Sequence, residues 1–186
     1  MKYRVLIVSH CFLNDAVKLM NQDVGEQANE KKLKQEFLQY AIREGIELVQ
    51  LPCPEFLIYG SLRWGHAVSQ FDNPFFRDRV DEMLKPIILQ IKEYLKYPER
   101  FEMIGILGID GSPSCGVNFT YDGEWGGEFY SNTHLEETFA TMKRVNQMGI
   151  LMDEFKLLLE KESIEIPFYG LENYPYQNKF HSMDNL

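Results

Sequence analysis

The chain has 186 residues, of which 45% are hydrophobic and 25% charged, and its formal net charge is −9. This length and composition fit one folded domain with a sizeable core, and they argue against a disordered chain. The acidic balance argues against a broad nucleic-acid interface, and no apolar run is long enough to predict a membrane span.

In chain order, short apolar runs alternate with segments of helical periodicity. The apolar runs predict strands over residues 3–8, 46–51, 101–109, 150–152 and 164–168. The periodic segments predict helices over residues 28–44, 74–97, 134–148 and 153–162. Between them we expect a polar loop over 9–27, an irregular stretch over 55–70, a tight loop over 111–116 and a turn at 121–123.

This alternation predicts a three-layer α-β-α, Rossmann-like α/β domain with a mostly parallel sheet covered on both faces. The chain shows no repeat and no linker, so residues 1–186 are interpreted as a single domain. Its last residues, 173–186, are polar and are expected to form a loosely held tail. Ligands of such sheets bind beyond the carboxyl ends of the strands. The sequence leaves the oligomeric state open.

The N-terminal residues contain one short apolar run and no small-residue cleavage site, so no signal peptide is predicted. We therefore expect a cytoplasmic protein. The chain has 3 cysteines, and an odd number in a reducing compartment argues against a disulfide framework. These cysteines are then core residues, nucleophiles or metal ligands.

Each cysteine comes just after a predicted strand. Cys11 follows the first strand, Cys53 the second and Cys115 the third. Since the carboxyl ends of parallel strands share one edge of a sheet, we expect the three thiols to converge there. A single free cysteine is most often a small buried hydrophobic residue. Three cysteines in end-of-strand loops favour a common site instead.

Three thiolates allow three kinds of site. A structural zinc site uses four ligands and usually shows close cysteine pairs, but the chain has no C-x-x-C, and His10 directly adjoins Cys11. A single catalytic cysteine needs a histidine base and leaves the other two cysteines unexplained. A [4Fe-4S] cluster normally takes four cysteines. With three, one iron stays open to bind substrate.

Four strings of residues resemble the motifs of a known family. They are Ser9-His10-Cys11-Phe12-Leu13-Asn14, Cys53-Pro54-Glu55, Ser112-Pro113-Ser114-Cys115-Gly116 and Tyr121-Asp122-Gly123. In order and spacing they resemble the thiouracil desulfurase family of TudS-like proteins, over residues 3–155. The segment 17–20 stands where that family has an Arg-Tyr pair, so the chain resembles a divergent branch.

The resemblance implies an enzyme, a desulfidase that depends on a [4Fe-4S] cluster. Cys11, Cys53 and Cys115 would hold the cluster. The substrate would be a small thiolated compound such as a thiopyrimidine, whose sulfur is replaced by water and leaves as hydrogen sulfide without net redox change. By position, Glu55 would be the acid/base carboxylate, and Ser112 a helper close to the substrate.

Read as chemistry, Glu55 is two residues from Cys53, and a carboxylate in a closed pocket suits proton transfer near neutral pH. Its alternative role is to cap the helix that follows the proline. Ser112 and Ser114 could donate hydrogen bonds to cluster sulfur or to substrate oxygen, and their alternative role is ordinary turn chemistry. We count all three as candidate catalytic residues.

Three further residues are predicted to bind substrate. Arg63 could hold a carbonyl or phosphate with its forked donors, although a lone arginine is usually solvated. His10 and Asn14 flank the first cysteine, and the ring N–H of His10 could tune a cluster. A histidine in such a position is more often a satisfied core residue.

Two other functions remain open from the sequence. The chain could be a non-catalytic module that holds a cluster or ligand without turnover. It could also be a cluster-free α/β enzyme with Cys115 as nucleophile, which leaves Cys11 and Cys53 without a role.

Overall fold

The centre of the molecule is a four-stranded sheet in which all strands run parallel, in the order β2-β1-β3-β6. The computed structural model describes residues 2–20 and 24–175. The strands are β1 (Tyr3–Val8), β2 (Ile46–Gln50), β3 (Phe101–Gly108) and β6 (Phe168–Gly170). The predicted mixed α/β architecture with a parallel sheet is confirmed.

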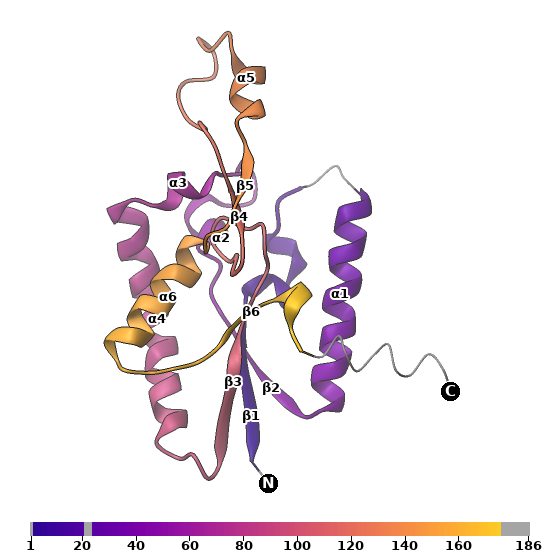
Figure 1. The fold of residues 1–186 in the computed structure, drawn as a ribbon, viewed down its shortest axis with the longest axis vertical. Coiled ribbons are helices and arrows are strands. Elements are labelled where there is room, and N and C mark those ends of the chain that lie inside the picture. Colours follow the sequence, from indigo (N-terminus) through magenta and orange to yellow (C-terminus); the bar gives the residue numbers. More distant parts are fainter. Residues whose placement is uncertain (1, 21–23, 176–186) are drawn as a thin grey trace.

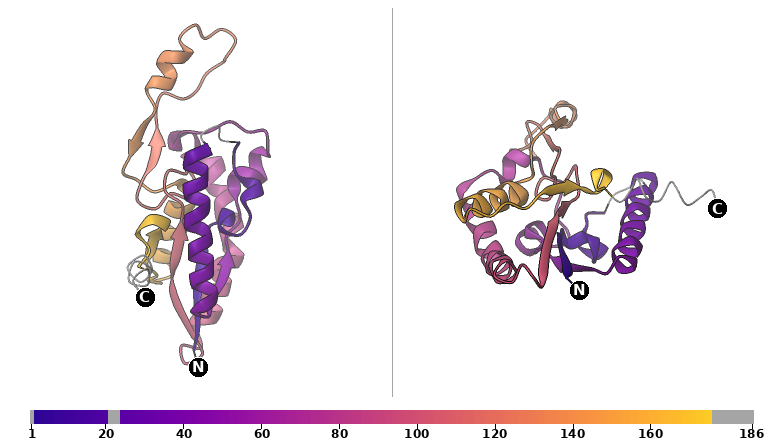
Figure 2. Two further views of the ribbon diagram at one scale, coloured as in Figure 1. Left: turned by 90° about the vertical axis from the view of Figure 1, so that its right-hand side faces the viewer. Right: turned by 60° about the horizontal axis from the view of Figure 1, so that its bottom comes forward.

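Helices cover both faces of this sheet (Figures 1 and 2). Helix α1 (Val24–Arg43) lies on one face, while α4 (Pro74–Leu95) and α6 (Ile150–Lys161) pack together on the other. Asn73 starts α4, because its side chain accepts a hydrogen bond from the amide of Phe76 (3.0 Å) and Pro74 follows it. The result is the three-layer arrangement expected from the sequence.

Strand β1 is buried on both sides. Leu6 and Val8 pack into the core cluster under α1, with Phe37 and Ala41. Ile7 points to the opposite cluster, between the sheet and the helices α4 and α6. Burial on both faces explains why β1 reads as a continuous apolar run rather than as an alternating one.

The chain order of the strands reverses between β1 and β3. From β1 the chain crosses over through α1 to β2 on one side, and then returns through α4 to β3 on the other side. In open parallel sheets such a switch point leaves a crevice outside the carboxyl ends of the two strands. Cys11 and Cys115 come from the loops that follow these two strands.

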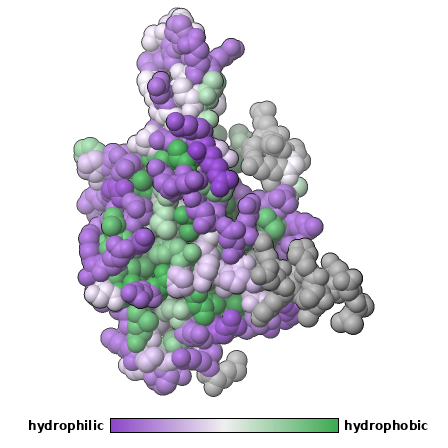
Figure 3. Space-filling view, viewed as in Figure 1, coloured by the Kyte–Doolittle hydropathy of each residue, from purple (hydrophilic) through white to green (hydrophobic). Residues whose placement is uncertain are grey.

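A slender arm projects from the body at this end of the molecule (Figure 1). It consists of β4 (Thr120–Asp122) and β5 (Lys143–Val145), which pair antiparallel, and of α5 (Leu135–Ala140). The face drawn in Figure 3 gathers apolar residues over the body, whereas the arm is mostly hydrophilic. The buried hydrophobic clusters lie in the body, on the two sides of the parallel sheet.

Two predicted elements differ because tertiary contacts override local pattern. The helix expected over 134–148 ends at Ala140, since Lys143–Val145 pairs with β4 instead, and the expected turn at 121–123 is largely that partner strand. The strand expected over 150–152 is the first turn of α6. All three of its residues are buried and apolar, so this turn lacks the spacing of polar and apolar residues that indicates a helix.

The remaining differences concern loops and boundaries. The stretch 55–70 contains the short helices α2 (Pro54–Tyr59) and α3 (Val68–Phe71). The polar loop after β1 contains two 3-10 turns, η1 (His10–Phe12) and η2 (Asp15–Val17), and ends where α1 begins. The last strand pairs at Phe168–Gly170 rather than over 164–168, and it is followed by η3 (Leu171–Asn173).

The end of the chain is described as far as residue 175. Tyr174 is buried, and its ring meets the rings of Phe37 and Tyr169 edge to face, at centroid distances of 5.6 and 5.2 Å. The rest of the predicted tail, 176–186, lies outside the described residues. Within the described ranges, none of the helices combines the length and apolarity that crossing a membrane demands.

Candidate active site

The three cysteines line one cavity of about 290 Å³. Cys11 lies in η1 after β1, Cys53 directly precedes α2 after β2, and Cys115 lies in the loop after β3. This common position at the carboxyl edge of the sheet is what the strand order predicts. We call this cavity the thiol pocket. Its wall also includes Glu55, Arg63, Ser112 and Ser114.

The loop that carries Cys115 is held from behind by the first turn of α6. The amide of Gly149 donates to the carbonyl of Gly116 (2.9 Å), and the amide of Leu151 donates to the carbonyl of Ser114 (3.0 Å). A Cβ on Gly149 would lie 2.5 Å from the carbonyl carbon of Ser114, so this close approach requires glycine. The loop's carbonyls thus face α6.

Asp110 anchors the same loop from the end of β3. One carboxylate oxygen accepts the amides of Val117 and Asn118 (both 2.8 Å), and the other accepts the side-chain amide of Asn118 (2.7 Å). Asp110 also lines the thiol pocket. We did not single it out from the sequence, although an Asp-Gly pair directly after a strand is a signal for a side chain that organises a turn.

The cysteines lie in surroundings that disfavour free thiolates. Burial raises the pKa of Cys115 to about 12, against the effect of hydrogen bonds from Ser114 and Ser9. Burial also raises the pKa of Cys11, and the nearby Cys115 adds to this. For Cys53, burial raises the pKa while backbone amides at the start of α2 oppose the rise. A cation bound between the thiols would stabilise their thiolate forms.

Glu55 is buried and is held by donors on both carboxylate oxygens. Its Oε1 accepts hydrogen bonds from Ser114 Oγ (2.6 Å) and Ser112 Oγ (3.2 Å). Its Oε2 lies 3.4 Å from Arg63 Nε, in an ion pair whose side chains are 9% and 4% exposed. The carboxylate is therefore oriented before any ligand binds.

The two serines connect this carboxylate to Cys115. The hydroxyl of Ser114 is fully buried and lies 3.4 Å from Cys115 Sγ. Cys115, Ser114 and Glu55 therefore form one continuous chain of polar contacts. Ser112 Oγ in turn accepts from the amide of Cys115 (3.0 Å), which fixes the loop in place.

Arg63 is not a solvated surface arginine. Its Nη2 donates to the carbonyl of Val17 (2.7 Å) and its Nη1 to the carbonyl of Gly60 (3.0 Å), while Nε faces Glu55. All three nitrogens thus contact the chain itself. The guanidinium ties the loop after β1 to the segment that follows α2, so it holds two walls of the thiol pocket together.

His10 and Asn14 are not among the residues that line the thiol pocket. His10 Nδ1 lies 3.1 Å from the carbonyl of Leu51, and its own carbonyl accepts from Gln50 (2.7 Å). Asn14 accepts from the amide of Ala16 (3.1 Å) and so begins η2. Both side chains connect loops near Cys11, and the structure does not bring them into the cavity.

An ion-pair network built on one buried lysine, which we did not predict, lies beside Cys11. Lys34 of α1 is 4% exposed; its ammonium donates to the carbonyl of Cys11 (3.3 Å) and pairs with Glu30 (3.0 Å) and with Asp15. Lys18, on the pocket wall, pairs with Glu30 as well. A lysine in a helix usually reads as solvated, so the sequence carries no signal for this role.

Comparison with known proteins gives a family. No family model matches the chain, and no solved structure matches it. The chain is 30% identical over 114 residues to the uncharacterized protein MJ0003 of Methanocaldococcus jannaschii, a match that covers 61% of this chain and 68% of the archaeal protein. The chain belongs to the same family as MJ0003. That relative's name assigns no activity, so the function of this MJ0003-family member has to be argued from its pocket.

The thiol pocket of this MJ0003-family chain combines soft sulfur ligands with an oriented carboxylate. Thiolates favour zinc, copper(I) and iron–sulfur clusters over hard cations. Among the described residues, no three His, Cys, Asp or Glu side chains are grouped closely enough to hold one metal ion.

Proposed function

We propose that this chain is an iron–sulfur-dependent desulfidase that removes sulfur, as hydrogen sulfide, from a small thiolated compound such as a thiopyrimidine. The observation that carries the proposal is the meeting of three thiols and a buried, oriented carboxylate around one cavity. The resemblance of the cysteine motifs to the thiouracil desulfurase family supports it further.

The donor set fits a [4Fe-4S] cluster with three protein ligands. Each cysteine of such a cluster binds a different iron, so the sulfur ligands stand farther apart than the ligands of one ion. Cys11, Cys53 and Cys115 reach the cavity from three separate loops, which would let each of them bind a different iron. When bound, the cluster supplies one iron without a protein ligand, and binding of a thiocarbonyl sulfur there makes that sulfur a better leaving group.

Glu55 is the group that moves protons. Water adds to the thiocarbonyl carbon, the carbon–sulfur bond breaks, and the products are a carbonyl compound and hydrogen sulfide. No electrons are gained or lost. The Glu55 carboxylate takes one proton from the attacking water and a second from the hydroxyl that has been added to the carbon, and it passes both to the departing sulfur. Its place on the wall of the thiol pocket and its burial support this role.

Ser112, Ser114 and Arg63 act on Glu55 rather than on the substrate. The hydroxyls of Ser112 and Ser114 donate to Oε1 of Glu55, and the guanidinium of Arg63 lies against Oε2. With its orientation set in advance, the carboxylate loses little freedom when the substrate arrives. Arg63 is therefore assigned a positioning role in place of the substrate contact expected from the sequence.

The experiment is sulfide release by protein reconstituted anaerobically with iron and sulfide. Wild-type protein is expected to release sulfide from 2-thiouracil. Glu55→Gln is expected to keep the same iron content and to lose about 10²–10⁴-fold in rate, since it cannot accept the proton. Glu165→Gln, an exposed position outside the pocket, is the matched control. Fully loaded wild-type protein that releases no sulfide from any thiolated nucleobase would refute the proposal and favour a non-catalytic module.

The cluster-free alternative has less support. A cysteine nucleophile reacts as the thiolate, whereas burial raises the pKa of Cys115 to about 12. In addition, the described residues that line the thiol pocket include no histidine to act as its base.

A further inference from the structure

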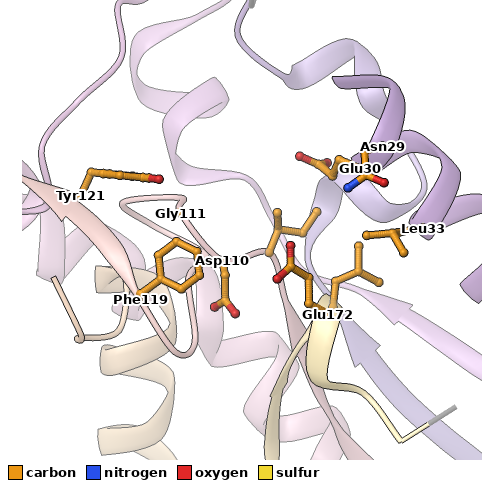
Figure 4. A pocket seen from close by; sticks show the side chains of 10 residues that line it. Asn29, Glu30, Leu33, Asp110, Gly111, Phe119, Tyr121 and Glu172 are labelled. Carbon is orange, nitrogen blue, oxygen red and sulfur yellow. The ribbon is translucent and has the colours of Figure 1, made fainter. Parts of the chain in front are cut away.

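A second cavity of about 120 Å³ adjoins the thiol pocket (Figure 4). We call it the outer chamber. The residues common to both cavities are Glu30, Ile109, Asp110, Gly111 and Tyr121. Those that line only the outer chamber include Asn29, Phe119, Leu171 and Glu172. A ligand that reaches the three thiols can therefore extend into this second space.

The outer chamber has an apolar side and an acidic side. Ile109 and Leu171 supply aliphatic surface, and Tyr121 projects from the arm side, opposite Asn29 and Glu30 on α1 (Figure 4). Tyr121 is 43% exposed and borders both cavities, so a flat heterocycle bound there could pack against its ring.

Of the three carboxylates in the outer chamber, two are already engaged. Asp110 holds the amides of the loop behind it, and Glu30 is paired with lysines of the Cys11 network. The carboxylate of Glu172 makes no hydrogen bond or ion pair within residues 2–20 and 24–175. In Figure 4 it points into the chamber beside Asp110. Glu172 is thus an acceptor that a ligand can use.

The lining of the outer chamber, as far as the chain is described, holds three acidic side chains and no lysine, arginine or histidine. Carboxylates accept hydrogen bonds from sugar hydroxyls, as the acidic residue of dinucleotide-binding folds does with ribose. A phosphate would instead face like charges and no donor fork. The chamber is also less than half the size of the thiol pocket, about 120 Å³ against about 290 Å³, which favours a single small ring as its occupant.

We propose that the outer chamber binds the sugar of a thiolated nucleoside, with the base lying at the mouth of the thiol pocket against Tyr121. Glu172 accepts from the sugar hydroxyls and, with Asp110, excludes a 5′-phosphate. The preferred substrate is then a nucleoside rather than a free base or a nucleotide. This inference rests on the proposed function for the role of the base, but binding itself needs no turnover.

Binding of the sulfur-free ligands tests the chamber separately from the reaction. Calorimetry on the reconstituted protein compares uridine, uracil and uridine 5′-monophosphate. Uridine is expected to bind at least about tenfold more tightly than either of the others, since only it adds hydroxyl contacts without a phosphate. Equal affinity for uridine and its monophosphate, or no measurable binding of uridine, would overturn the inference.

A charge reversal at Glu172 tests whether this residue sets the ligand preference of the outer chamber. Glu172→Lys is expected to weaken binding of uridine and to strengthen binding of uridine 5′-monophosphate. The control is Glu165→Lys, which changes the net charge by the same amount at an exposed site outside both cavities. It is expected to leave both affinities unchanged. Equal effects of the two variants would contradict the assignment. If the desulfidase proposal fails and the outer-chamber proposal holds, the protein binds uridine preferentially but releases no sulfide. If the desulfidase proposal holds and the outer-chamber proposal fails, the protein desulfurates thiouracil and thiouridine monophosphate as fast as thiouridine.

Discussion

The hydroxyl of Ser114 lies 2.6 Å from Oε1 of Glu55, and both side chains are buried. The same hydroxyl is 3.4 Å from Cys115 Sγ. One short side chain therefore links a thiol at the end of β3 to a carboxylate at the start of α2, two elements that meet only through the fold.

Removing the Ser114 hydroxyl should destabilise the protein. Ser114→Ala takes away a buried hydrogen bond to a carboxylate, and we expect the free energy of unfolding to fall by about 1.5–3 kcal/mol. Urea unfolding measures this. Ser112→Ala is the matched control, because its hydroxyl is less buried and lies farther from Glu55 (3.2 Å), so its loss should cost less. Equal stability of Ser114→Ala and wild type would contradict the proposed contact.

Removing Arg63 should lower the free energy of unfolding further, because it leaves the buried Glu55 carboxylate without its counter-ion. Arg63→Met leaves Glu55 without its cation and also breaks the bonds to Val17 and Gly60. We expect a loss of about 3–5 kcal/mol in unfolding free energy. The double variant Arg63→Met with Glu55→Gln should recover part of that loss, since no unpaired charge remains buried. Strictly additive effects in this double-mutant cycle would show that the ion pair contributes nothing.

In metal-free protein the cysteines should react slowly with iodoacetamide at neutral pH. Burial holds the pKa values of all three thiols above their ordinary range, so little thiolate is present. We expect alkylation of the folded protein to be at least about tenfold slower than that of the urea-unfolded chain, with mass spectrometry assigning each site. Rapid and selective alkylation of Cys115 would instead support the cluster-free nucleophile.

Tyr174 should make stability depend on pH in the alkaline range. Burial, followed by the nearby Tyr40, raises its pKa to about 12, above the ordinary value of about 10. The unfolded chain therefore loses this proton first as the pH rises. The stabilisation from the protonated phenol is complete below pH 10 and is lost between about pH 10 and 12. Urea unfolding on both sides of pH 10 should show a shallower decline for Tyr174→Phe, and identical slopes would contradict the burial.

The parallel sheet and the meeting of the cysteines were predictable because both depend on local signals. Each cysteine comes a few residues after an apolar run, and the central strand β1 is buried on both faces, which makes it easy to recognise. Once the strands are known to be parallel, their carboxyl ends must share an edge. No contact between distant residues had to be guessed.

The role of Arg63 was not predictable in the same way. Its partner Val17 is 46 positions away in the sequence, and neither residue type predicts that the two are in contact. Glu172 likewise reaches the outer chamber only because η3 follows the last strand back to the edge where the cysteines lie. Local patterns also failed at Lys143–Val145, where pairing with β4 decides the structure. Such contacts are set by the assembled fold rather than by any short stretch of sequence.

The most direct test of the account is an iron count after anaerobic reconstitution, with the absorption spectrum recorded on the same sample. The account predicts about four irons per chain and a brown protein for wild type. It also predicts loss of most of that iron in each of Cys11→Ser, Cys53→Ser and Cys115→Ser, while Glu165→Gln keeps it. Wild-type protein that stays colourless and iron-free, or any one of these cysteine variants that retains the full iron content, would contradict the shared cluster.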